Sequence, residues 1–260
     1  MISTNPSGPA STGHRPTDHP HSRQGLASTA SSDSSALPAT IGGFMIIIAA
    51  VALAAYPMLR GSGSEAGLTG AALYARPAWL LAHCLGMLGF VSMAWGLSSI
   101  DRWASRLAWA GAVLVLPYYG AEAFGLHALG QVALADQDAA MVAAADGFRY
   151  HPVAMTVFAA GLLALAACGV RMILLVRRPG SALHRVGLVL AGLGLIAYLP
   201  QFFTPIEVRI GHGLLLGVGL LILAISAITR AAGPSYRSAA TRSRTAAAID
   251  SRSSRDGSTR

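Results

Sequence analysis

Three ionisable side chains, each in a separate apolar stretch, are the residues of this sequence best placed to do chemistry. His83, Glu122 and His212 each lie about six or seven positions from one end of their stretch. With a rise of about 1.5 Å per residue, a helix would put each of them roughly 10 Å below the same membrane face. Ionisable groups at that depth are costly and usually functional. We therefore expect these three side chains to form the core of one binding pocket.

The residue types of this pocket leave several kinds of chemistry open. Two imidazoles and a carboxylate suit Zn, Fe or Cu, so His83, Glu122 and His212 are candidate metal ligands. His83 and His212 could instead be the axial ligands of a haem. Proton-linked or small-solute transport is a third interpretation, because buried His and Glu titrate in a useful range. The HExxH signature of helical zinc sites is absent, and the other halves of the stretches contain few polar residues.

Further polar residues are predicted to surround the three core residues. Two tyrosines precede Glu122 by three and four positions, and an arginine precedes His212 by three, so each shares a helix face with its neighbour. The predicted periphery comprises Tyr118, Tyr119, His127, His151 and Arg209. In the alternative interpretation Glu122 is only a structural partner of Arg209, of a histidine or of a tyrosine. The charges would then lock helices together in a non-catalytic membrane component.

The composition places these residues in a membrane protein. The chain has 260 residues, of which 53% are hydrophobic and 12% charged, and its mean hydropathy is +0.54. Soluble domains carry about 25% charged residues. The net charge of +8 would suit a nucleic-acid-binding protein, but no recognised nucleic-acid-binding motif occurs, so we expect no nucleic-acid partner. The lack of lysine together with abundant Ala, Gly and Arg is typical of a bacterial gene.

Six apolar stretches predict an all-α bundle of six transmembrane helices in residues 39–230. They cover about 39–58, 77–99, 103–129, 152–175, 183–200 and 205–229. A helix needs about 20 apolar residues to cross a bilayer, and these stretches are too long for barrel strands. Pro77, Pro152 and Pro205 are predicted to mark helix starts, and Pro117 a kink. Glycine pairs in the second and sixth stretches, Gly86 with Gly89 and Gly213 with Gly217, predict that these helices pack together.

The arginines predict the orientation. Ten lie at or beyond the stretch ends on the side of the chain termini, and four, Arg60, Arg76, Arg149 and Arg209, lie on the other side. By the positive-inside rule both termini face the cytoplasm and the protein lies in the plasma membrane. Residues 1–38 and 231–260, rich in Ser and Thr, are expected to be disordered cytoplasmic tails. In the second tail Arg237, Arg242 and Arg244 are expected to face the bilayer, where they could contact anionic lipid.

Overall fold

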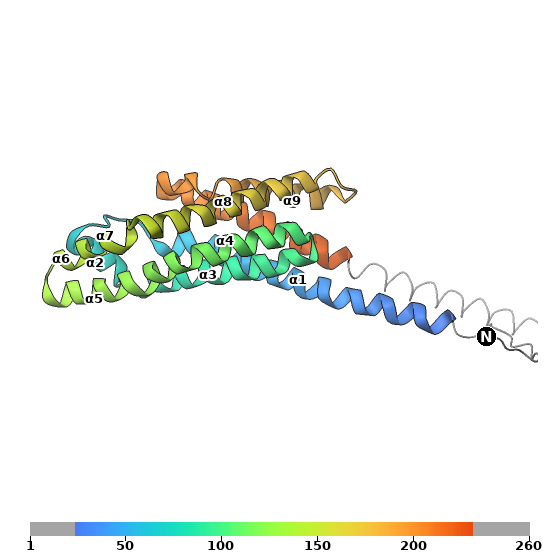
Figure 1. Cartoon of the computed structure of the whole chain (residues 1–260), viewed down its shortest axis with the longest axis horizontal. Helices are drawn as coiled ribbons and strands as arrows, with labels where there is room; N and C mark the ends of the chain where they lie inside the picture. Colours follow the sequence, from blue (N-terminus) through green and yellow to red (C-terminus); the bar gives the residue numbers. More distant parts are fainter. Residues whose placement is uncertain (1–23, 231–260) are drawn as a thin grey trace, which may run out of the picture.

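The structure, a computed structural model, describes residues 24–230, and side chains from residue 40 onward. The described residues form helices and no strand, arranged as one elongated bundle (Figure 1). The long helices are α1 (Gln24–Arg60), α3 (Pro77–Gly96), α4 (Arg102–Gly120), α8 (Pro152–Leu175) and an unlabelled C-terminal helix, Ile206–Arg230. The shorter ones are α2 (Gly67–Tyr74), α5 (Leu126–Asp136), α6 (Ala140–Ala144), α7 (Asp146–Arg149) and α9 (Ala182–Ile196). Three single turns, η1 (Leu97–Ser99), η2 (Ala121–Gly125) and η3 (Pro200–Phe203), complete the list.

Five helices in the described residues are long and apolar enough to cross a membrane, which indicates a multi-pass membrane protein. Proline starts two of them as predicted, because α3 begins at Pro77 and α8 at Pro152. The helix Ile206–Arg230 begins one residue after Pro205. The missing N–H of proline costs nothing in the first turn, where no intrahelical partner exists.

The fifth predicted span, about 183–200, is shorter than expected. It is the 15-residue helix α9, which ends at Ile196. At about 1.5 Å per residue it is about 22 Å long, less than the thickness of a bilayer core of about 30 Å. Pro200 gives the physical reason, since it has no N–H to donate to the carbonyl of Ile196. The chain continues there as the 3₁₀ turn η3 instead.

The first helix begins earlier than expected. Residues 1–38 were predicted as a disordered tail, but α1 starts at Gln24, inside that segment. Extending an existing helix requires no new nucleus. Residues 1–23 and the predicted tail 231–260, with Arg237, Arg242 and Arg244, lie outside the described residues.

The third span is a 35-residue helical segment, Arg102–Asp136, interrupted by the π-helical turn η2. The predicted irregularity therefore lies just after Pro117, at Ala121–Gly125. At its end the N–H of Leu126 donates to the carbonyl of Ala121, five residues back. Such π turns widen a helix locally and are frequent at functional sites. Glu122 is part of this turn.

The paired glycines pack against α1, and Gly86 also against Tyr119 of α4, rather than against each other. A Cβ placed on Gly89 would meet Leu53 of α1, and one on Gly217 would lie 2.9 Å from the carbonyl oxygen of Ala50 of α1. The prediction that the second and sixth spans pack together through these glycines is therefore wrong. Small residues of α1 let both helices approach it, since Ala52 lies beside Gly89, and Ala50 and Ala54 lie beside Gly217.

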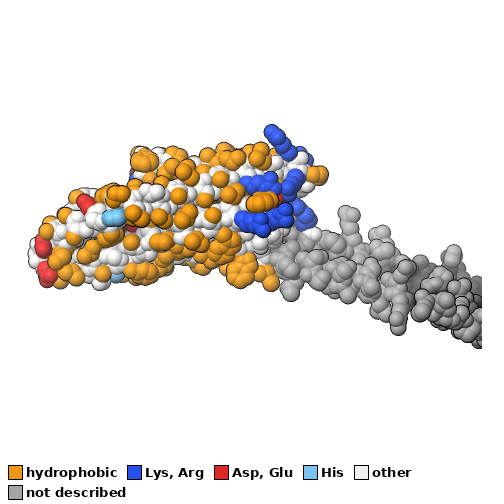
Figure 2. All heavy atoms as spheres, viewed as in Figure 1, with side chains coloured by type: hydrophobic (Ala, Val, Ile, Leu, Met, Phe, Trp, Pro, Cys, Tyr) orange, Lys and Arg blue, Asp and Glu red, His pale blue; other side chains and the backbone are white. Residues whose placement is uncertain are grey.

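Charged side chains gather at the two ends of the bundle, and apolar side chains cover its length (Figure 2). We name the "acidic end" after residues 61–76 and 130–151, which include Glu65, Asp136, Asp138 and Asp146. We name the "basic end" after residues 97–106 and 176–185, which include Arg102, Arg106, Arg177, Arg178 and Arg185.

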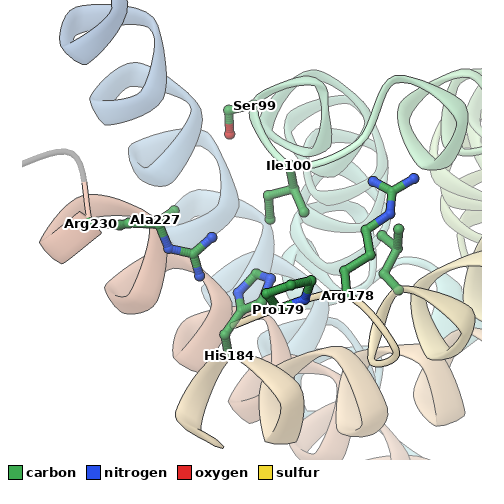
Figure 3. A pocket seen from close by; sticks show the side chains of 8 residues that line it. Ser99, Ile100, Arg178, Pro179, His184, Ala227 and Arg230 are labelled. Carbon is green, nitrogen blue, oxygen red and sulfur yellow. The ribbon is translucent and has the colours of Figure 1, made fainter. Parts of the chain in front are cut away.

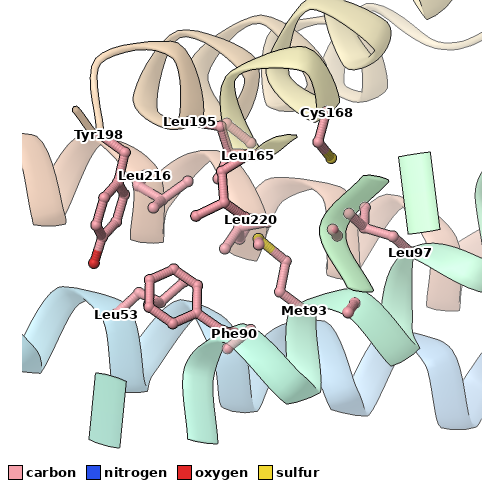
Figure 4. Close-up of a cluster of buried hydrophobic side chains, with 14 of the residues drawn as sticks. Leu53, Phe90, Met93, Leu97, Leu165, Cys168, Leu195, Tyr198, Leu216 and Leu220 are labelled. Carbon is pink, nitrogen blue, oxygen red and sulfur yellow. The ribbon is translucent and has the colours of Figure 1, made fainter. Parts of the chain in front are cut away.

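An apolar core fills the bundle between the two ends. Phe90 and Met93 of α3 face Leu165 of α8, with Leu216 and Leu220 of the C-terminal helix beside them (Figure 4). All five side chains are buried. Within the described residues this core separates the polar groups of the acidic end from those of the basic end.

Candidate functional site

Glu122 is the centre of a buried polar cluster near the acidic end. Its side chain is almost fully buried, and its Oε1 accepts a 2.8 Å hydrogen bond from Nε of Arg149, in α7. Its other oxygen, Oε2, lies 3.7 Å from Nε2 of His83, in α3. The structure thus brings together two of the three predicted core residues, His83 and Glu122. Oε2 accepts no hydrogen bond from another described residue.

Arg149 connects Glu122 to a second carboxylate, Glu65, in the loop after α1. Arg149 Nη2 donates to Glu65 Oε2 at 2.7 Å, and Arg60 donates to Glu65 Oε1 at 2.6 Å. Partial burial alone would raise the pKa of Glu65, but the two guanidinium groups lower it to about 2. Tyr74, at the end of α2, donates its hydroxyl to the backbone carbonyl of Glu65 and accepts from Arg149. The result is an ion-pair chain from Arg60 to Glu122.

The imidazole of His83 is held by a hydrogen bond to a backbone carbonyl and by two aromatic side chains. Its Nδ1 lies 2.8 Å from the carbonyl oxygen of Trp79, and because a carbonyl only accepts, Nδ1 carries the proton. In the neutral ring Nε2 is then an acceptor. Trp79 and Tyr56 pack against the ring at centroid distances of 4.5 and 5.3 Å. Trp79 also donates its indole N–H to the carbonyl of Glu122, which ties α3 to the π turn.

A cavity of about 300 Å³ opens beside His83 and Glu122. Its polar lining includes Arg60, Glu65, Arg149 and Arg209, and its aromatic lining includes Tyr56, Tyr118, Tyr119, Tyr150, Phe158, Phe202 and Phe203. Mostly apolar and aromatic walls with a few polar groups are typical of small-molecule sites. The cavity, the open Oε2 of Glu122 and the unbonded Nε2 of His83 form what we call the "Glu122 site".

His212 does not join this cluster. Its Nε2 donates to the carbonyl oxygen of Gly194 in α9 at 2.7 Å. The sequence placed His83 and His212 at one depth, but depth says nothing about the direction around the bundle. No group of three His, Cys, Asp or Glu side chains in the described residues could hold a metal ion. His83, Glu122 and His212 therefore do not make the expected three-ligand metal centre there.

The predicted periphery divides into two groups. Tyr118, Tyr119 and Arg209 line the cavity. Tyr118 stacks on Phe158 at 4.3 Å, and the hydroxyl groups of Tyr119 and Tyr198 are 3.0 Å apart. Arg209 is anchored by donating to the backbone carbonyls of Thr204 and Phe202.

The two interface histidines have local structural roles instead. His127 is bonded through Nδ1 to the carbonyl of Tyr74 at 2.9 Å. His151 precedes α8 and accepts from the N–H of Val153. Neither residue lines the cavity of the Glu122 site.

Arg60, Glu65 and Arg149 are site residues that were not predicted from the sequence, although a signal for them existed. Four arginines occur on the side with few positive charges, and three of them, Arg60, Arg149 and Arg209, line this cavity. In a membrane protein of this kind, arginines on the side with few positive charges are therefore the residues to examine first as site candidates.

The fold indicates a class of protein, the multi-pass helical membrane proteins. No family model matches the chain, and the comparisons with curated proteins and with solved structures gave no match.

Proposed function

We propose that this membrane protein binds a small molecule in the Glu122 site, through an amine or hydroxyl group of that molecule. The observation that supports this is the 3.7 Å gap between Glu122 Oε2 and His83 Nε2 beside a cavity. With Nδ1 protonated, both facing atoms are acceptors, and two acceptors need a donor between them. A primary amine has enough N–H groups to donate to both atoms, and a hydroxyl group donates its single hydrogen to one of them.

The apolar walls and the volume of the cavity indicate the size and the apolar part of the expected ligand. Phe158, Phe202 and Met155 offer an apolar surface next to the polar pair. A cavity of about 300 Å³ is at the small end of the range for organic ligands, about 300–1,000 Å³. We therefore expect a compact amphipathic molecule whose polar group meets Glu122 and His83 while its apolar body lies against the phenylalanines.

The test compares three probes of nearly equal shape on the purified protein in detergent. Benzylamine and benzyl alcohol carry a donor group, and toluene does not. We expect the two donors to raise the thermal unfolding midpoint by about 2–4 °C more than toluene does. The variant His83→Phe keeps the ring and removes Nε2, so this difference should disappear. Equal effects of all three probes on the wild type would overturn the proposal.

His127→Phe is the matched control. His127, like His83, is bonded through Nδ1 to a backbone carbonyl, but it does not line the cavity. It should therefore keep the wild-type response to all three probes. Ala159 lines the cavity, and Ala159→Phe should fill it and abolish the response without touching any charge.

A second candidate function is purely structural, and one observation favours it. Arg149 joins Glu122 of η2 to Glu65 of the loop after α1, and the described residues contain no fully buried side-chain polar atom without a partner. In this alternative a water molecule bridges Glu122 and His83, and no probe stabilises the protein.

For the orientation we propose that the basic end faces the cytoplasm and the Glu122 site lies near the opposite face of a bacterial plasma membrane. The excess of arginine at the basic end supports this. Single cysteines at Asp138 and Arg177, one at each end, test it. A membrane-impermeant maleimide should label the first in intact cells and the second only after lysis. The opposite pattern would reverse the orientation.

A further inference from the structure

A second cavity, of about 390 Å³, lies at the basic end, far along the bundle from the Glu122 site. Three separate parts of the chain line it: the turn after α3, the segment from the end of α8 to the start of α9, and the end of the C-terminal helix. Its lining residues are Ser99, Ile100, Leu175, Arg178, Pro179, His184, Ala227 and Arg230. We name it the "Arg178 pocket". Arg230 and His184 lie on one side of Ile100 and Arg178 on the other (Figure 3).

The Arg178 pocket carries positive charge that the described residues around it do not neutralise. Asp101 is the acid beside it, and both Asp101 oxygens are already engaged by Arg171, at 3.0 and 2.8 Å. Arg178 adds one longer bond of 3.2 Å to the same carboxylate, and its side chain is 61% exposed. Two arginines on one carboxylate leave a net positive charge, and Arg230 adds another on the opposite side of the pocket. Such a site attracts an anion.

The walls of the pocket point to an anion with an apolar part. Ile100, Leu175, Pro179 and Ala227 give it an apolar lining beside the two guanidinium groups. Large apolar side chains within two positions of the lining residues in the sequence are exposed, including Leu174, Leu183 and Ile225. These side chains belong to membrane-spanning or apolar helices, where acyl chains are the natural neighbours. Basic pockets between such helices bind lipid headgroups.

From these observations we propose that the Arg178 pocket binds the phosphate headgroup of an anionic membrane lipid. Arg178 and Arg230 hold the phosphate from two sides, and the acyl chains lie along the exposed apolar side chains of α8, α9 and the C-terminal helix. The site is distinct from the basic tail residues Arg237, Arg242 and Arg244, for which the sequence analysis predicted contact with anionic lipid.

The experiment uses the full chain in nanodiscs of phosphatidylcholine with about one fifth phosphatidylglycerol, followed by native mass spectrometry of the lipid retained by the protein. The wild type should retain phosphatidylglycerol preferentially. The double variant R178Q/R230Q should lower that retention by about tenfold or more. R177Q/R185Q is the matched control, because it removes the same charge from the same end outside the pocket, and it should retain the lipid.

Two further arms keep the proposal falsifiable. Ala227→Leu fills the pocket without changing its charge, so it should also lower retention even if the arginine variants fold poorly. Inorganic phosphate, added at a concentration similar to the lipid, should neither stabilise the protein nor displace phosphatidylglycerol. Unchanged retention in both pocket variants, or equal stabilisation by inorganic phosphate, would overturn the assignment to a lipid.

Discussion

Glu122 and Asp101 are buried carboxylates near opposite ends of the bundle, and both are held by arginine. Asp101 caps α4 by accepting from the N–H groups of Trp103 and Ala104, and it accepts three more hydrogen bonds from Arg171 and Arg178. Every acceptor position there is in use. Glu122 accepts one hydrogen bond through its carboxylate, from Arg149, and its second oxygen faces His83 across a 3.7 Å gap.

We call Asp101 with Arg171 and Arg178 the "lock", meaning a buried ion pair that only stabilises the fold. The comparison with Glu122 shows how such a lock differs from a buried ion pair that can bind a ligand. A carboxylate with five satisfied bonds has nothing left to offer a ligand, and its interactions serve stability. A carboxylate whose second oxygen faces a cavity can still accept a hydrogen bond from a ligand. Burial and charge alone would rank the two sites equally. The number of bonds that remain to be made separates them.

Asp101→Asn should produce the largest effect. The asparagine keeps an oxygen for the helix cap but turns an N–H₂ group toward the arginines. We expect a loss of about 2–3 kcal/mol in the free energy of unfolding, because hydrogen bonds between charged groups are lost while the guanidinium groups stay in place. Urea titration in detergent, followed by circular dichroism, measures this loss.

The control is Asp138→Asn. Asp138 is half-buried and accepts from the N–H of Ala140, but no ion pair of its side chain with another described residue is present. We expect it to change stability by less than about 0.5 kcal/mol. If both substitutions cost the same, Asp101 is only a helix cap and the interpretation of this end as a lock fails.

The second-largest effect is expected from acid, which should lower the free energy of unfolding by weakening the lock. Hydrogen bonding from Arg171 lowers the pKa of Asp101 to about 2, below its ordinary value of 3.8. A depressed folded-state pKa gives stability that is fully present above about pH 4 and is lost as the pH falls toward 2. Because solvent screens part of the interaction, we expect a loss of about 1–2 kcal/mol over that range. The stability of Asp101→Asn should depend less on pH there, measured by the same titration at several pH values.

Glu65 provides the internal comparison for this pH dependence, since its pKa is also lowered to about 2. Glu65→Gln should likewise flatten the profile, and the double variant should be flatter than either single variant. A profile unchanged by Asp101→Asn would show that its carboxylate is not held as the structure has it.

At the other end Glu122→Gln should cost about 1 kcal/mol, less than Asp101→Asn. Arg149 keeps its bond to Glu65 in this variant, and the cavity lets water reach the changed group. The same urea titration gives the comparison directly. A loss as large as that of Asp101→Asn would mean that Glu122 is a second lock, which favours the structural alternative.

The fold of this chain is easier to predict from its sequence than the site is. Apolar length and the proline starts are local properties, so they located the long helices, and they failed where Pro200 shortens α9. A shared depth grouped His83, Glu122 and His212, and of these the structure brings together His83 and Glu122. Partners such as Arg149 depend on how the connections between helices fold back over the bundle, and no local pattern encodes that. The same limit misplaced His212, because the direction of a side chain around a bundle follows from how the helices pack, and His212 is bonded to Gly194 of α9.

The smallest effect on stability is expected from Arg178→Gln, and it links the lock to the Arg178 pocket. Arg171 already engages both oxygens of Asp101, while Arg178 contributes one bond and is 61% exposed. Exposed ion pairs contribute about 0–1 kcal/mol, so Arg178→Gln should cost less than about 0.5 kcal/mol in urea titration without anionic lipid. A cost close to that of Asp101→Asn would make Arg178 an essential part of the lock. A small cost means that its charge remains available to a bound phosphate. In nanodiscs that contain phosphatidylglycerol, Arg178→Gln should therefore lose more stability relative to the wild type than it does in phosphatidylcholine alone.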